Sequence, residues 1–156
     1  MTEANGSSTR RGPIPPVLLL AALLIQAAVH VLIPSAQVIP RSWDFLGILI
    51  VIGGFAVVVV AAQQFKRAGT TVKPFEDSTA LVTSGVFAVS RNPMYLGMVV
   101  VLVGVAMGLG SLVSLLVPFV FAWMLEIRFI RPEERRLAQL FGEPYSEYTQ
   151  RVRRWL

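Results

Sequence analysis

The chain has 156 residues, of which 54% are hydrophobic, and a net charge of +5. Its mean hydropathy of +0.65 is too high for a soluble domain of this length. The absence of cysteine excludes disulfides, thiolate metal sites and cysteine nucleophiles, and with a single histidine we expect no protein-built metal site. Because the basic residues flank apolar runs, they indicate membrane orientation and contact with membrane lipids, and we expect no nucleic-acid partner.

These properties predict an all-α, polytopic membrane helix bundle. A disordered tail over residues 1–12 should precede a single domain over residues 13–156. Uncharged runs approach the ~20 residues that a membrane-spanning helix needs. They predict four transmembrane helices, over about residues 16–33, 45–62, 93–108 and 111–131. We expect a cytosolic loop over residues 63–92 and cytosolic C-terminal helices over residues 132–156.

The first two spans carry features that point to helix contacts. Gln26 and His30 lie four residues apart and therefore on one helix face. They fit a proton carrier or ligand, or else an interhelical hydrogen bond, and the second interpretation is favoured because such contacts are common in membrane bundles. In the second span, Gly53 and Gly54 predict close contact with a neighbouring helix. In the third span, Gly104 forms a small-residue pair with Gly108.

The boundaries of the later helices have local signals. Asn92 is predicted to cap the third span with its side chain, and Pro93 fits the first helical position. Such a helix start offers N–H donors and a partial positive charge that suit an anion, although it also serves simply to begin a helix. Residues 108–111 predict a tight hairpin. Pro132 predicts a break after the last span, and Gly142 predicts a helix stop.

The distribution of Lys and Arg predicts the topology. There are two in the N-terminal tail, one in the first loop, four in the second, none in the hairpin and seven from Arg128 onward. Four spans with both termini in the cytoplasm place thirteen of the fourteen on the cytoplasmic side. We therefore expect a multi-pass integral protein, of the bacterial inner membrane, with cytoplasmic N- and C-termini.

Charged residues cluster at the inner end of the last span. They are Glu126, Arg128, Arg131, Glu133 and Glu134. An arginine there can clamp a carboxylate or phosphate through two hydrogen bonds, and a glutamate can accept hydrogen bonds from a ribose or an amine. The same cluster also fits a juxtamembrane belt that anchors the helix, and both interpretations stay open.

Two sequence blocks resemble one known family. The first comprises residues 81–87 (LVTSGVF) and 91–97 (RNPMYLG), and the second comprises residues 133–137 (EERRL) and 141–148 (FGEPYSEY). In this order they resemble the isoprenylcysteine carboxyl methyltransferase and phospholipid methyltransferase family of integral membrane enzymes. The resemblance runs from about Gly69 to Trp155.

The resemblance implies transfer of a methyl group from S-adenosylmethionine, without a Rossmann fold. The acceptor would be lipid-like or a small hydrophobic molecule, methylated on a carboxylate, amine or hydroxyl at the cytosolic membrane face. Carboxyl-methylating relatives carry an arginine four residues before the acidic cofactor contact, where this chain has Phe129. The neighbouring Arg128 and the acidic Glu133 are therefore the candidate catalytic residues. The resemblance places cofactor contacts at Thr79, Ala80, Leu81, Val82, Phe87, Asn92, Pro93, Met94, Tyr95, Glu133 and Glu134.

A different class of function is also open. The chain could be a non-enzymatic four-helix membrane protein, either a transporter or a lipid-binding scaffold. A transporter needs a coupling acid or base near the bilayer midplane, where this chain offers Gln26 and His30. A scaffold explains the arginines but not the two paired motifs. Binding of S-adenosylmethionine separates the enzyme from both alternatives.

Overall fold

The structure is a computed structural model that describes residues 14–33, 44–69 and 80–156. The predicted tail over residues 1–12 and the candidate Thr79 lie outside these ranges. The described residues form the predicted all-α architecture. Its segments are α1 (Pro15–Leu32), α2 (Asp44–Arg67), the 3₁₀ segment η2 (Gly85–Ala88), α3 (Pro93–Gly108), α4 (Leu116–Leu125), the π-helical segment η3 (Glu126–Ile130), α5 (Arg131–Phe141) and α6 (Glu143–Arg151).

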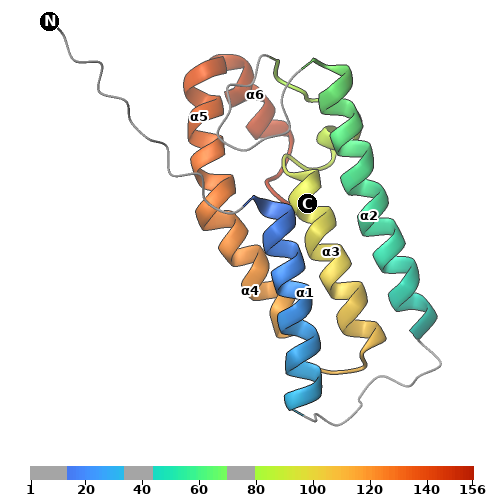
Figure 1. Cartoon of the computed structure of the whole chain (residues 1–156). Helices are drawn as coiled ribbons and strands as arrows, with labels where there is room; N and C mark the ends of the chain where they lie inside the picture. The colour runs from blue at the N-terminus through green and yellow to red at the C-terminus, as the bar shows by residue number, and fades with distance from the viewer. Residues whose placement is uncertain (1–13, 34–43, 70–79) are drawn as a thin grey trace, which may run out of the picture.

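The helices α1 to α4 lie side by side in an elongated bundle, and α5 and α6 gather at one end of it (Figure 1). The closest pair is α2 and α3, while α1 contacts both α3 and α4. The core between them is apolar and includes Met98, Leu102, Phe121, Leu125 and Ile130. Burial of these side chains, at about 25 cal/mol per Å² of apolar surface, holds the bundle together.

The helix bounds agree with the predicted spans to different degrees. The first and third predicted spans match α1 and α3 within one residue. The second helix is longer than predicted and ends at Arg67, because residues 61–67 are good helix formers despite their polarity. Among the described residues, α1 and α2 are long and apolar enough to cross a membrane, whereas α3 is apolar but shorter. Four membrane spans therefore stay a prediction.

The α3–α4 connection is longer than predicted. Residues 109–115 form turns, so that α4 begins at Leu116 and not at residue 111. The amide of Gln26 on α1 reaches into this region and donates hydrogen bonds to the carbonyl oxygens of Leu102 (3.0 Å) and Ser114 (3.2 Å). Gln26 is fully buried. These bonds confirm the favoured interpretation of Gln26 as an interhelical contact, and they join α1 to α3 and to the α3–α4 connection.

The expected break at Pro132 is wrong. The segments α4, η3 and α5 follow one another as a single rod (Figure 1), and Pro132 lies in the first turn of α5. Within η3 the helix widens, because the N–H of Arg131 donates to the carbonyl of Glu126, five residues earlier. A proline ring normally clashes with the carbonyl four residues before it. The wider π turn displaces that carbonyl, so that the rod continues through the proline.

A seam of glycines joins α2 to α3. Gly47 and Gly54 on α2 face Gly104 and Gly97 on α3, in antiparallel order and with seven-residue spacing. A Cβ atom added at Gly104 would lie 2.7 Å from the carbonyl oxygen of Gly47, and one at Gly97 would lie 2.6 Å from that of Gly54. Gly53, by contrast, has nothing within 4 Å of its Cβ position. The two backbones are therefore packed without intervening side chains, as the predictions for Gly54 and Gly104 require.

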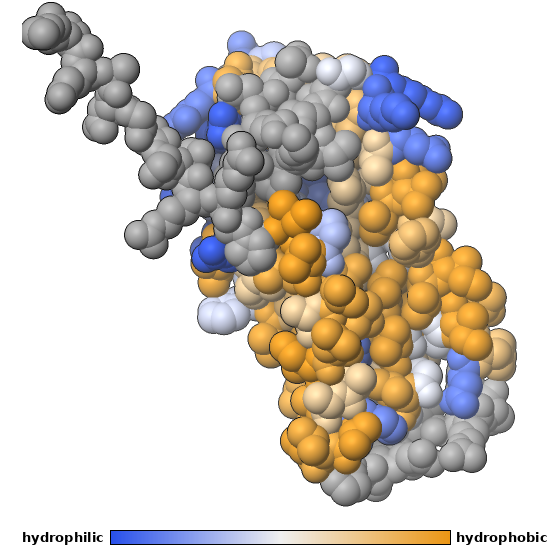
Figure 2. Space-filling model, in the orientation of Figure 1, coloured by the Kyte–Doolittle hydropathy of each residue, from blue (hydrophilic) through white to orange (hydrophobic). Residues whose placement is uncertain are grey.

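The outer surface of the bundle is apolar. Figure 2 shows hydrophobic residues over the broad middle of one face, while hydrophilic residues gather at the upper end, where α5, α6 and the end of α2 lie. Large apolar side chains on α1, α2 and α4 are exposed, among them Leu24, Ile25, Ile52, Phe55, Phe119 and Trp123. An exposed apolar surface of this extent is typical of a membrane-embedded protein.

Candidate active site

A cleft opens at the polar end of the bundle. It is a shallow, open cleft, and the space of about 490 Å³ over it includes open solvent. Its walls come from the end of α2, the segment 80–92, and helices α5 and α6. The lining residues are Phe65, Ala80, Leu81, Val82, Phe87, Arg91, Asn92, Glu133, Glu134, Leu137, Tyr145 and Tyr148. Both sequence blocks that carry the family resemblance therefore contribute to one cleft.

The segment 80–92 is fixed by contacts on both of its sides. Gly85 adopts a positive φ of 61°, which lets the chain turn into η2. Phe87 is buried, and its ring packs edge-on against Phe65 of α2 with a centroid distance of 4.8 Å. The hydroxyl of Tyr148 on α6 donates a 2.6 Å hydrogen bond to the carbonyl of Phe87. The apolar end of the cleft is thus bound to the bundle and to α6.

The turn before α3 is docked onto the C-terminal segment. The N–H of Arg91 donates to the carbonyl of Arg153 (3.0 Å), and the Asn92 side-chain amide donates to the carbonyl of Arg154 (3.1 Å). The predicted capping role of Asn92 is therefore wrong, because its side chain serves this long-range contact and makes no cap hydrogen bond. The helix still begins at Pro93 as predicted. The hydroxyl of Ser90 accepts from the N–H of Asn92 at 3.1 Å.

The two adjacent glutamates of α5 have different surroundings. Glu134 is paired with Arg154 through contacts of 2.7 and 3.0 Å and with Arg91 at 3.3 Å. Glu133 accepts a hydrogen bond from the hydroxyl of Tyr95 at 3.1 Å. Desolvation by burial raises the pKa of Glu133, and the neighbouring charge of Glu134 adds to this, while the bond from Tyr95 acts in the opposite direction. Glu134 is thus neutralised by arginine, and Glu133 is not.

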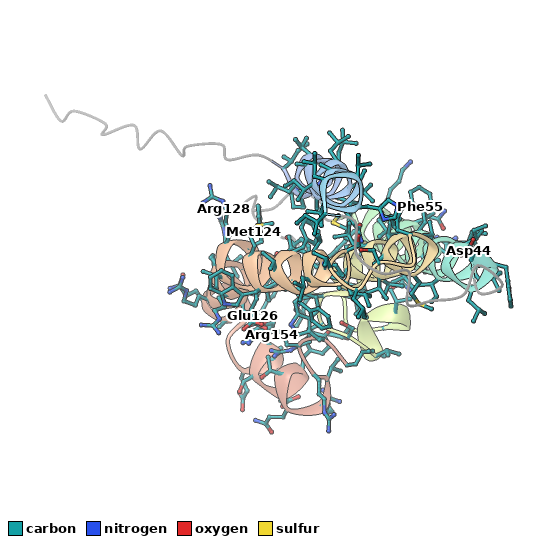
Figure 3. The ribbon with its side chains drawn as sticks, turned by 90° about the horizontal axis from the view of Figure 1, so that it is seen from below. Asp44, Phe55, Met124, Glu126, Arg128 and Arg154 are labelled. Carbon is teal, nitrogen blue, oxygen red and sulfur yellow. The ribbon has the colours of Figure 1, made fainter. Side chains whose placement is uncertain are left out.

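Arg154 connects the C-terminal segment to the α4–α5 rod at two points. Besides its bonds to Glu134, its guanidinium donates to Glu126 at 3.0 Å. Glu126 also pairs with Arg131 at 2.9 Å and accepts a bond from the indole N–H of Trp155 at 3.3 Å. Figure 3 shows Arg154 beside Glu126, on the side of the rod that faces α6. Of this network, Glu134 lines the cleft.

The structure brings most of the candidate cofactor residues together. Those that line the cleft are Ala80, Leu81, Val82, Phe87, Asn92, Glu133 and Glu134. Pro93 and Met94 lie in the first turn of α3, outside the lining, and Tyr95 reaches the cleft through its bond to Glu133. Thr79 lies outside the described residues.

Arg128 is not brought to the cleft. It is exposed and lies on the opposite side of the rod from Arg154 (Figure 3). Glu133, by contrast, lines the cleft. The two candidate catalytic residues therefore point in different directions, and the arrangement does not support a joint role for them.

Other residues of the cleft were not among the predicted contacts. They are Phe65, Arg91, Leu137, Tyr145 and Tyr148. The helical spacing of Tyr145 and Tyr148 indicates only an apolar stripe, and Arg91 is notable only for its place beside Asn92. Burial raises the pKa of both Tyr145 and Tyr148 to about 12, so that both phenols stay protonated near neutral pH.

Fold and site together define an all-α protein with an apolar, membrane-type surface and a polar cleft at its charged end. The sequence model of the phospholipid methyltransferase family matches residues 43–144. The chain belongs to this family, whose blocks we identified around the cleft. It is accordingly a member of a family of membrane methyltransferases.

Individual relatives agree with this assignment. Protein-S-isoprenylcysteine O-methyltransferase A of Arabidopsis thaliana is 30% identical over 141 residues, covering 86% of this chain and 68% of that protein. The B form from the same plant is 38% identical over 77 residues, or 49% of this chain. The enzyme of Schizosaccharomyces pombe is 36% identical over 72 residues, or 46% of this chain. The match spans only 39% and 30% of the lengths of these last two proteins.

A solved structure has the same fold. The eukaryotic intramembrane Ras methyltransferase, an isoprenylcysteine carboxyl methyltransferase, superposes with a TM-score of 0.67. The superposition covers 88% of this chain and 50% of that one, with 24% sequence identity. At this identity the similarity is one of fold, and that protein's substrate is not transferred to this chain.

Proposed function

We propose that the protein transfers a methyl group from S-adenosylmethionine to a lipid-like or small hydrophobic acceptor at the cytosolic membrane face. The observation that carries this proposal is the cleft, which joins a cation, an uncompensated carboxylate and an aromatic end in one space. Both sequence blocks of the methyltransferase family meet there.

The charges of the cleft suit the amino-acid end of the cofactor. That end is a zwitterion, with one ammonium and one carboxylate. Glu133 has a carboxylate oxygen left to accept a bond from the ammonium, since its other oxygen accepts from Tyr95. Arg91 lines the cleft and contacts Glu134 through one guanidinium nitrogen, so that it has further donors with which to pair with the carboxylate. Of the two predicted acidic contacts, these surroundings favour Glu133.

The apolar end suits the adenosine. Phe65, Phe87 and Tyr148 offer aromatic faces and edges for the adenine ring and for a sulfonium cation. Residues 80–82 line the cleft, and their backbone groups are the proposed partners for the edge of the base. The bound cofactor supplies an activated methyl group on a sulfonium. The protein's contribution is to hold acceptor, methyl and sulfur in line, which needs no nucleophile from the protein.

The membrane arrangement is also part of the proposal. Helix α3 is about 24 Å long at 1.5 Å per residue, and α4 with η3 is of similar length. Both are shorter than the ~30 Å hydrocarbon core, and the proposal places them as short spans of the bacterial inner membrane, with the arginine-rich end and both termini in the cytoplasm. The acceptor would then approach from the bilayer and the cofactor from the cytosol. A carboxylate, amine or hydroxyl acceptor fits. The buried Phe129, beside Tyr95, offers no charge to a carboxylate.

The test is calorimetric binding of S-adenosylmethionine and S-adenosylhomocysteine to the protein in detergent. We expect saturable binding of both, and a loss of about tenfold or more in Glu133→Gln, since a charged hydrogen bond to the ammonium is removed. The matched control is Glu147→Gln, because Glu147 is exposed on α6. Absence of binding by the folded wild-type protein, or equal losses in both variants, would contradict the proposal.

A further inference from the structure

We propose that Arg154 is a positioning residue for the cofactor's amino-acid end, and that it acts by taking the larger share of Glu134, which leaves the charge of Arg91 only partly neutralised. This inference rests on the proposed function. Arg154 does not itself line the cleft, but its side chain bonds Glu134, which does.

Arg91 and Arg154 compete for the same carboxylate oxygen. The Oε1 of Glu134 accepts a 3.0 Å bond from Nε of Arg154 and lies 3.3 Å from a guanidinium nitrogen of Arg91. The second oxygen of Glu134 is bonded to Arg154 at 2.7 Å. The paired, two-bond geometry with Arg154 is the stronger interaction, so that Glu134 is oriented by Arg154 and touches Arg91 only with its shared oxygen.

Arg154 is itself fixed from three directions. Its third guanidinium nitrogen bonds Glu126 at 3.0 Å. Its carbonyl accepts hydrogen bonds from the Asn92 amide at 3.1 Å and from the Ser90 hydroxyl at 3.4 Å. These contacts join the C-terminal segment both to the rod and to the turn that carries Arg91. The side chain of Arg154 therefore orients Glu134, while its carbonyl holds Ser90 and Asn92 on either side of Arg91.

Removal of the Arg154 side chain would change the charge of the cleft. Glu134 would keep Arg91 as its cationic partner, and this pair is poorly screened because both side chains are about 15% exposed or less. Arg91 would then be neutralised by Glu134, and Glu133 would leave the cleft with a net negative charge. A cleft of this kind still accepts an ammonium and an adenosine. It repels a carboxylate.

The prediction is therefore selective for one part of the ligand. S-adenosylhomocysteine carries the amino-acid end, whereas 5′-methylthioadenosine has the same nucleoside and thioether without it. For Arg154→Ala we expect about a tenfold or greater loss of S-adenosylhomocysteine affinity, since one charged interaction is lost. Affinity for 5′-methylthioadenosine should change less than about twofold. For Arg154→Lys we expect an intermediate loss, because lysine keeps the charge but not the two-bond geometry.

The matched control is Arg151→Ala. Arg151 is 74% exposed, pairs with Glu147 on the surface of α6, and should leave both affinities unchanged. Each variant is first checked for folding by its thermal unfolding in detergent. Equal losses for both ligands in Arg154→Ala, or no loss for either, would overturn the inference. Failure of the wild-type protein to bind S-adenosylhomocysteine would overturn the proposed function, which the wild-type measurement alone decides.

Discussion

Tyr95 and Glu133 form the contact that joins the bundle to the cleft. Tyr95 is buried in the core of α3, and its hydroxyl is the hydrogen-bond donor to Glu133 on α5. The family resemblance includes Tyr95 among the cofactor contacts, and an aromatic ring suits adenine or a sulfonium. Its position behind Glu133 instead indicates an indirect role. Such a role cannot be inferred from the sequence, because 38 residues separate the two side chains.

This contact predicts a pH dependence. Glu133 must be ionised to bind an ammonium, and the bond from Tyr95 partly offsets the rise of its pKa that burial causes. Cofactor affinity should therefore fall as the pH drops through the pKa of Glu133. In Tyr95→Phe that pKa rises further, so the fall should begin at a higher pH. Calorimetric titrations from about pH 8 down to about pH 5 measure this. Superimposable profiles would show that Tyr95 does not tune Glu133.

The raised pKa of Glu133 also predicts that Glu133→Gln, which should bind the cofactor more weakly, is more stable than the wild-type protein. Since the folded-state pKa of Glu133 lies above the unfolded value of about 4.3, its contribution to stability is present below that value. This contribution is lost as the pH rises through the folded-state pKa. Glutamine stays neutral. Glu133→Gln should thus unfold at a higher temperature than wild type at neutral pH. The difference should vanish near pH 4, and a persistent one would point to another cause.

The variant Arg128→Ala tests whether Arg128 contributes to cofactor binding. Because it lies across the rod from the cleft, Arg128→Ala should leave the affinity for S-adenosylmethionine within about twofold of wild type, a change below 0.5 kcal/mol. Its predicted catalytic role then survives only if turnover with an anionic acceptor falls. A tenfold loss of cofactor affinity would mean that the rod is oriented differently in the cofactor-bound protein.

At the scale of the helices, the glycine seam sets how α2 and α3 pack. Gly104→Ala adds a methyl group against the Gly47 carbonyl and should destabilise the protein by about 1–3 kcal/mol. Gly53→Ala lies in the same pair of helices but meets open space, and it should be neutral or slightly stabilising because alanine favours helix. Thermal unfolding in detergent compares the two. Equal destabilisation by both would argue against close backbone packing.

The sequence predicts a helix end correctly where a residue at that end causes it. Pro93 begins α3, and Gly142, with a positive φ of 54°, ends α5. The start of α4 and the continuation through Pro132 were missed because their causes are not local. The first depends on a turn that is bonded to Gln26 of another helix, and the second depends on a π turn. In both cases tertiary contacts or hydrogen-bond register outweighed the residue's own preference.

For the whole molecule, the all-α fold and many of the residues that line the cleft are predictable from the sequence. The docking of the C-terminal segment beside the cleft is not. The residues of the two motifs that line the cleft could be named in advance because they lie within recognisable blocks. Arg91 and Arg154 could not, since their roles arise when segments about 60 residues apart dock together. The composition indicated a membrane protein, and the exposed apolar surface agrees with it.

The topology is a prediction for the molecule in its membrane, and the chain has no cysteine to interfere with labelling. Leu112, in the α3–α4 connection, and Gln139, on α5, are both exposed and lie near opposite ends of the bundle. A membrane-impermeant maleimide applied to intact cells should label Leu112→Cys and not Gln139→Cys. Both should react after the membrane is opened. The reverse pattern would invert the proposed orientation.

The π turn at residues 126–130 has a consequence for evolution. A π turn holds one residue more than an α turn, and it commonly records the insertion of a single residue into a helix whose two flanks keep their faces. Relatives without this residue should therefore show a one-residue gap within 126–130. They should also lack proline at the position of Pro132, because an ordinary α turn gives its ring no room. An ancestral chain that acquired the residue first could then have accepted the proline without losing the cleft.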